Sequence, residues 1–148
     1  MSDLIFSIYL SASKENLLKL LTDYTNFPNY LPHQIKSVII IEKTDSFTIT
    51  EETLHLSSVI SKTFVQQTKH FAFSNNTLKS EILTGPAKNS IMELKFDEKN
   101  SITNVSVKID IKLGLKYKFL SPIIKKSYKT FLMGILYKMQ AVANSKRE

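Results

Sequence analysis

The sequence contains no cysteine and no tryptophan, and it has only three glycines and four prolines in 148 residues. Without cysteine the chain can form no disulfide, no thiolate metal site and no cysteine nucleophile. A chain of this length is the size of one domain and buries roughly 70% of the surface that its unfolded form exposes, so it needs no covalent cross-links. We therefore expect a single domain over residues 1–148, and the missing cysteines suit a reducing cytoplasm.

Long hydrophobic runs are missing too. No segment reaches the ~18 apolar residues that a membrane-spanning helix requires. The first ten residues carry an acidic side chain and no early lysine, so they predict a β-strand and not a signal peptide. Together these features predict a soluble, cytoplasmic protein.

Arginine is nearly absent, because 19 of the 20 basic residues are lysine. Residues 1–98 carry 9 lysines against 11 acidic residues, whereas residues 99–148 carry 11 basic residues against 2 acidic ones. Such a basic segment is typical of a solvated face, or of contact with an anionic membrane, a lipid head group, or the RNA of a ribosome. Because planar, bidentate recognition of phosphate is a property of arginine, RNA is the less favoured of these partners.

Seven segments are rich in β-branched and aromatic residues and are separated by turn-forming residues, which predicts strands. The predicted strands cover residues 4–10, 35–43, 47–56, 59–73, 77–84, 90–97 and 102–113. In the last strand apolar and polar residues alternate, which indicates a sheet with one dry and one solvated face. Its apolar residues are Val105, Val107, Ile109, Ile111 and Leu113.

Three helices are predicted: two short ones after the first strand and one long one near the C-terminus. Ser13 is a good N-cap for a short helix that ends near residues 22–25, and Pro28 suits the first turn of a second one that Pro32 closes. A long helix is predicted from Ser121, as N-cap, and Pro122, at the first helical position, for about 24 residues. The resulting order predicts an α+β helix-grip fold, in which a seven-stranded curved antiparallel sheet surrounds the long helix and two short helices follow the first strand.

The motifs in this order resemble the START-like, Bet v 1-type (SRPBCC) superfamily, and within it the polyketide cyclase and coenzyme-Q-binding branch. The resemblance rests on residues 11–17, residues 21–32, and Gly85-Pro86 before the last hairpin. It implies an apolar cavity between the sheet and the long helix. The chain departs from that branch at Ala87, where an aromatic residue often follows Gly-Pro, and in having no tryptophan.

The fold that this resemblance implies predicts non-catalytic binding or transport of a hydrophobic small molecule, such as a lipid, isoprenoid, quinone or polyketide-like compound. We expect no cofactor, because the chain has no phosphate-binding glycine loop, and no metal, because its three histidines lack ligand spacing. No catalytic residue is predicted. The predicted ligand contacts are Phe27, Tyr30, Leu31, Phe64, Met92, Phe96, Phe119, Phe131, Ile135 and Met139.

Two alternative functions depend on other residues. A cyclase-like enzyme requires polar side chains in the cavity, for which the strands offer Glu52, His55, Gln66 and His70. Contact with a ribosome would depend on the basic C-terminal third as a whole, whereas contact with an anionic membrane requires a lysine cluster near the start of the long helix. The lysines of this predicted cluster are Lys116, Lys118, Lys125, Lys126 and Lys129.

Overall fold

A computed structural model describes residues 2–56 and 62–145. Its strands are β1 (Ser2–Leu10), β2 (Ile35–Lys43), β3 (Phe47–Leu56), β4 (Lys62–Phe71), β5 (Thr77–Ile82), β6 (Ile91–Lys99) and β7 (Ile102–Ile111). Its helices are α1 (Lys14–Leu21), the 3-10 helices η1 (Tyr24–Asn29) and η2 (Leu115–Leu120), and α2 (Ser121–Ser145). The strands form one sheet in the order β1-β7-β6-β5-β4-β3-β2. Every neighbouring pair is antiparallel, which confirms the predicted fold class.

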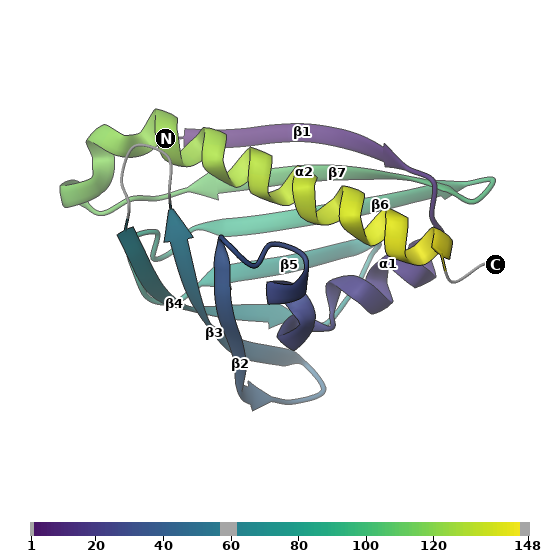
Figure 1. The fold of residues 1–148 in the computed structure, drawn as a ribbon, viewed down its shortest axis with the longest axis horizontal. Coiled ribbons are helices and arrows are strands. Elements are labelled where there is room, and N and C mark those ends of the chain that lie inside the picture. Colours follow the sequence, from purple (N-terminus) through teal and green to yellow (C-terminus); the bar gives the residue numbers. More distant parts are fainter. Residues whose placement is uncertain (1, 57–61, 146–148) are drawn as a thin grey trace.

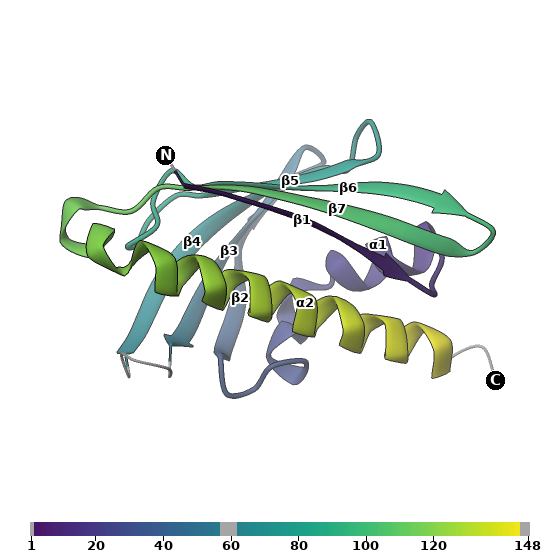
Figure 2. The ribbon, with the colours of Figure 1, turned by 90° about the horizontal axis from the view of Figure 1, so that it is seen from above.

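The long helix α2 crosses one face of the sheet from end to end (Figure 1). Seen from above, β2, β3 and β4 bend away from the plane of β1, β6 and β7, so that the sheet curves around α2 (Figure 2). The two short helices α1 and η1 lie beside the C-terminal half of α2 (Figure 1). A single long helix therefore covers the concave face, and the short helices close one end.

The core follows the alternation that the sequence predicts for the last strand. Val105, Val107, Ile109 and Ile111 are buried on β7 and share one hydrophobic core cluster with the fully buried Leu136 and Met139 of α2. Each buried side chain of this size contributes about 1.5–3 kcal/mol. This layer of aliphatic side chains joins the β1–β7–β6 half of the sheet to the helix.

The first short helix forms as predicted, because the Ser13 hydroxyl accepts a hydrogen bond from the Asn16 amide at 3.2 Å. The second begins earlier than predicted, at Tyr24, and contains Pro28. Its 3-10 turns are closed by bonds from Asn26 N to Asp23 O (3.1 Å) and from Tyr30 N to Phe27 O. Pro28 lies between these donors, where its missing amide proton is not required.

Strand ends and the start of the long helix differ in detail from the predictions. β4 begins at Lys62, so the predicted residues 59–61 lie outside the described part of the chain, and β7 ends at Ile111 and not at 113. Ser121 is not an N-cap: its φ of −49° and ψ of −48° are helical, because η2 leads directly into α2. The chain is therefore helical from Leu115 onward, first as a 3-10 helix and then as an α-helix.

Candidate functional site

Two adjoining cavities lie between the sheet and α2. The inner cavity has a volume of about 130 Å³, and the outer one, near η2 and the start of α2, has about 70 Å³. Most of the lining side chains are apolar. The two cavities share the lining residues Leu54, Gln66, Tyr128 and Phe131, so they are neighbouring compartments of one elongated space.

Polar side chains gather at the inner cavity on three adjacent strands. The two-residue period of a strand places alternate residues on one face, and the register pairs Thr50 with Thr68 and Glu52 with Gln66. These side chains, which we name the polar floor, lie on β3, β4 and β5, next to the aliphatic β1–β7–β6 half of the sheet. Five members of the polar floor line the cavity: Glu52 of β3, Gln66, Thr68 and His70 of β4, and Ser80 of β5. The sixth, Thr50 of β3, is fully buried and hydrogen-bonds to His70.

Hydrogen bonds order the part of the polar floor around Glu52. The Gln66 side-chain amide donates to the Thr68 hydroxyl at 3.4 Å, and that hydroxyl donates to Oε1 of Glu52 at 2.6 Å. The second carboxyl oxygen, Oε2, is buried and has no hydrogen-bond partner among the described residues. Burial raises the pKa of Glu52 to about 7, and the Thr68 hydrogen bond opposes this rise. The carboxyl group is therefore partly neutral at neutral pH.

His70 is held on three sides within the same floor. Its Nε2 lies 2.9 Å from the Thr50 hydroxyl and its Nδ1 lies 2.8 Å from the Ser80 hydroxyl. The imidazole stacks on the Tyr24 ring with 4.1 Å between the centroids. Burial lowers the pKa of His70 to about 4, so the ring is neutral at neutral pH.

The remaining titratable groups around the inner cavity are two tyrosines, and burial raises the pKa of Tyr24 and of Tyr128 to about 12. For Tyr128 the nearby charge of Glu52 adds to this rise. No lysine or arginine of the described chain lines either of these two cavities. Nothing cationic therefore stabilises an ionised Glu52.

The structure brings five of the ten predicted ligand contacts to the cavities: Phe27, Phe64, Met92, Phe131 and Ile135. Four others lie in the core without lining either cavity: Tyr30, Leu31, Phe96 and Met139. Phe96, for example, packs edge-on against the Phe73 ring, with the centroids 5.9 Å apart. Ligand contact through the five that line the cavities remains a proposal.

The tenth predicted contact, Phe119, lies outside both cavities, and its side chain is 77% exposed. In the 3-10 helix η2, side chains three residues apart share a face. Tyr117 and Leu120 take the inward face and line the outer cavity, so Phe119 points to solvent. The sequence alone did not show that residues 115–120 are a 3-10 helix.

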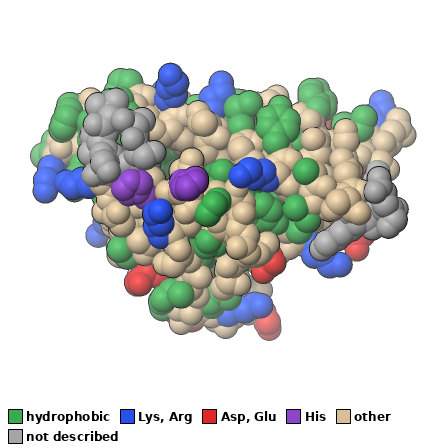
Figure 3. All heavy atoms as spheres, in the orientation of Figure 1, with side chains coloured by type: hydrophobic (Ala, Val, Ile, Leu, Met, Phe, Trp, Pro, Cys, Tyr) green, Lys and Arg blue, Asp and Glu red, His purple; other side chains and the backbone are tan. Residues whose placement is uncertain are grey.

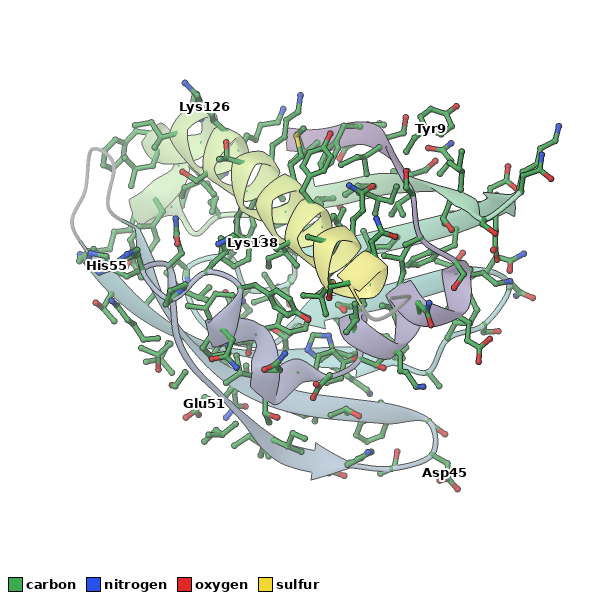
Figure 4. The ribbon with its side chains drawn as sticks, turned by 45° about the vertical axis from the view of Figure 1, so that its right-hand side comes forward. Tyr9, Asp45, Glu51, His55, Lys126 and Lys138 are labelled. Carbon is green, nitrogen blue, oxygen red and sulfur yellow. The ribbon has the colours of Figure 1, made fainter. Side chains whose placement is uncertain are left out.

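All four polar residues named for the enzyme alternative line the cavities, with Glu52 and His70 at the inner one, His55 at the outer one and Gln66 at both. Figure 4 shows the neighbouring Glu51 on the opposite face of the sheet, away from α2. The sequence carries no alternation that singles these residues out, because residues 66–70 (Gln-Gln-Thr-Lys-His) are all polar. Thr50, Thr68, Ser80 and Tyr128 were not predicted as members of the site.

No protein-family model and no curated protein matches the sequence. Solved structures do match. The Zhui aromatase/cyclase from a Streptomyces species has a TM-score of 0.82 at 10% identity, covering 99% of this chain and 96% of its own. A START superfamily protein from Mycobacterium smegmatis has 0.76 at 15% identity, covering 97% of each chain. Ginseng major latex-like protein 151 from Panax ginseng has 0.70 at 15% identity, covering 96% and 97%.

This chain has the START-like helix-grip fold. The resemblance found in the sequence is thereby confirmed at the level of the fold. The neighbours of this START-like chain include Bet v 1-like proteins and polyketide aromatase/cyclases. At identities of 10–15% they show the fold alone, so the activity has to be argued from the cavity itself.

The outer surface of this START-like chain is basic and apolar at the end where α2 begins. Leu115 is 85% exposed there, next to the exposed Phe119, and lysine and hydrophobic side chains mix at this end (Figure 3). An open hollow of about 680 Å³ lies beside the outer cavity and is lined in part by Lys88, Lys112 and Lys116. Lys126 projects from α2 away from the sheet (Figure 4).

Within residues 2–56 and 62–145, no group of three or more histidine, aspartate or glutamate side chains is arranged to hold a metal ion. None of the helices there combines the length and the apolar content that a bilayer crossing requires.

Proposed function

We propose that this chain binds a hydrophobic small molecule in the space between the sheet and α2, without chemical change. The observation that carries the proposal is the mostly apolar lining of the two adjoining cavities between the sheet and α2. At ~24 cal/mol per Å³, an empty inner cavity of about 130 Å³ would cost about 3 kcal/mol. That is a large share of the ~5–15 kcal/mol by which a typical domain is stable, so an occupant is favoured.

Native mass spectrometry of gently purified protein, followed by lipid extraction, tests this proposal. We expect a co-purifying lipid, isoprenoid, quinone or polyketide-like compound, or micromolar binding when such compounds are added. Absence of both would overturn the proposal. Five apolar or aromatic residues on η1, β4, β6 and α2 are proposed to contact the ligand: Phe27, Phe64, Met92, Phe131 and Ile135.

A cyclase-like enzyme is the second candidate, and Glu52 is the observation that favours it. A general acid or base is most effective when its pKa lies near the working pH, and burial raises the pKa of Glu52 to about 7. The test is turnover of a poly-β-ketone mimic by the wild type and by Glu52→Gln. An enzyme requires turnover that the variant loses while it still binds the compound.

Contact with an anionic membrane is proposed for the surface end where η2 meets α2. We define this docking end as Leu115, Phe119 and the lysines 116, 118, 125, 126 and 129. Each lysine close to an anionic bilayer contributes ~1 kcal/mol, and the exposed Leu115 and Phe119 can enter the lipid interface. Tyr117 and Leu120 of the same 3-10 helix line the outer cavity, so docking would bring that cavity to the lipid. Ribosomal RNA is the competing partner of these lysines, and co-sedimentation with ribosomes over a salt series tests it.

A further inference from the structure

The hydrogen bonds of the polar floor have a direction that ends at Glu52. The Gln66 amide nitrogen can only donate, so the Thr68 hydroxyl accepts from it and uses its own proton for Oε1 of Glu52. A neutral carboxyl group has one accepting carbonyl oxygen and one donating hydroxyl. Oε1 takes the accepting role, which leaves Oε2 as the hydroxyl oxygen.

Oε2 of Glu52 is the unsatisfied polar atom of the site. Four buried side-chain atoms of the described chain lack a hydrogen-bond partner, and only this one belongs to a residue that lines the cavities. The other strong polar group, His70, already has a hydroxyl partner at each ring nitrogen. A buried donor without a partner costs about 1–3 kcal/mol, so a ligand atom that satisfies Oε2 gains that difference.

The surroundings of Glu52 favour a neutral carboxyl group and therefore an accepting ligand. The titratable groups that face the inner cavity are Tyr24 from η1, His70 from β4 and Tyr128 from α2, and none is charged at neutral pH. An ammonium ligand carries up to three donors, but the floor leaves one atom free. Burying that charge among apolar walls is also unfavourable.

We infer that the inner cavity holds its ligand by a carbonyl oxygen, which accepts a hydrogen bond from the protonated carboxyl group of Glu52. This inference rests on the proposed ligand-binding function and adds the chemical class of the ligand. The apolar body of the ligand lies against Phe131 and Ile135, and its ketone, quinone or ester oxygen points toward β3.

Three compounds of nearly equal shape separate the possibilities: 2-acetylnaphthalene, 2-ethylnaphthalene and 1-(2-naphthyl)ethylamine. Dissociation constants are measured by isothermal titration at pH 5.5, 7 and 8.5. Because a net hydrogen bond changes affinity by a few-fold to about tenfold, the ketone should bind about fivefold more tightly than the hydrocarbon at pH 5.5. This preference should disappear at pH 8.5, where Glu52 is ionised.

Variants of Glu52 test whether its carboxyl group is the hydrogen-bond donor to the ligand. Glu52→Gln keeps a donor, so it should keep the preference for the ketone and lose its dependence on pH. Glu52→Leu should bind ketone and hydrocarbon equally. Glu51→Gln is the matched control, because it makes the same change on the opposite face of the sheet and should behave as the wild type.

The outcomes distinguish failure of the carbonyl inference from failure of the proposed ligand-binding function. If the wild type binds ketone and hydrocarbon equally at all three pH values, the carbonyl inference is wrong and ligand binding stands. Preference for the amine, with affinity that rises with pH, overturns the inference in favour of a cationic ligand. If the wild type binds none of the three compounds and no lipid or quinone, the proposed function fails and the inference fails with it.

Discussion

Burial moves the pKa values of Glu52 and His70 in opposite directions, which gives the two residues opposite effects on folding. Glu52 changes from 4.5 to about 7, so between these values the folded state holds an extra proton and stability falls as pH rises. His70 changes from 6.5 to about 4, so between these values the unfolded state holds the extra proton and stability rises with pH. From pH 4.5 to 6.5 the two effects oppose each other.

Replacing Glu52 with glutamine should expose the effect of His70. We expect the free energy of unfolding of Glu52→Gln to rise steeply from pH 4 to 6.5, where the wild type changes little. Above pH 7 the variant should be more stable than the wild type by about 1–3 kcal/mol, since a shift of one unit corresponds to 1.36 kcal/mol. Urea unfolding at four or five pH values measures both. A Glu52→Gln profile parallel to the wild type would contradict the raised pKa.

The identity of these residues could be predicted from the sequence, but their orientation could not. A strand has two faces, and a shift of one residue exchanges them, so residues 52, 66 and 70 could equally have faced solvent. The register pairs Glu52 with Gln66, and the packing of α2 over one face of the sheet decides that this pair lines the cavity. Tyr128 was missed because it comes from α2, and only the packing of the helix brings it to Glu52.

In α2, Gly134 is a position at which a larger side chain can raise the stability of the fold. A Cβ atom at Gly134 would meet Leu31 Cδ2 at 3.6 Å, which is an ordinary contact. Glycine inside a helix costs about 1 kcal/mol relative to alanine. Gly134→Ala should therefore raise the free energy of unfolding by about 1 kcal/mol, as measured by urea or thermal unfolding. A loss of stability would show that Leu31 cannot tolerate even a methyl group beside it.

In the turn between β5 and β6, unlike at Gly134, the fold requires a glycine. Gly85 has a φ of +100°, and a Cβ atom there would lie 3.2 Å from both Gln66 Cβ and Val65 O. Gly85→Ala should destabilise the fold by about 1–3 kcal/mol, because it adds backbone strain and a close contact with β4. Lys88→Ala, in the same turn, is the control and should change stability little. Equal unfolding midpoints for both variants would contradict this role of Gly85.

Strands were easier to predict than helix ends in this chain. The starts and ends of β2 and β3 agree with the prediction to the residue, because β-branched runs end there at clear turn residues. The segment 115–120 gave no such pattern: Leu115 and Phe119 are apolar but exposed, so their hydrophobicity does not mark the buried face. The 3-10 helix η2, and with it the position of Phe119, therefore had to come from the structure.

For the whole molecule, the two halves of the sheet have different roles. The β1–β7–β6 half presents an aliphatic surface that packs on α2, whereas β3, β4 and β5 present the polar floor to the cavity. The docking end lies at one end of α2, and α1 lies beside the other end (Figure 1). This separation means that charge changes at the docking end can be tested without altering the polar floor.

Charge reversal at the docking end is the last prediction. Lys116→Glu with Lys118→Glu should abolish most binding to vesicles of anionic phospholipid at low salt, because it removes two favourable charges and adds two repulsive ones. The affinity for a soluble ligand should stay at the wild-type value.

Lys19→Glu with Lys99→Glu makes the same change in net charge on exposed residues of α1 and the β6 end, and should keep vesicle binding. Vesicle co-sedimentation from 25 to 300 mM salt, over which the Debye length falls roughly 3.5-fold, measures the effect. Equal loss in both variants would mean that net charge alone attracts the membrane, and no wild-type binding at low salt would leave α2 only as the cover of the cavity.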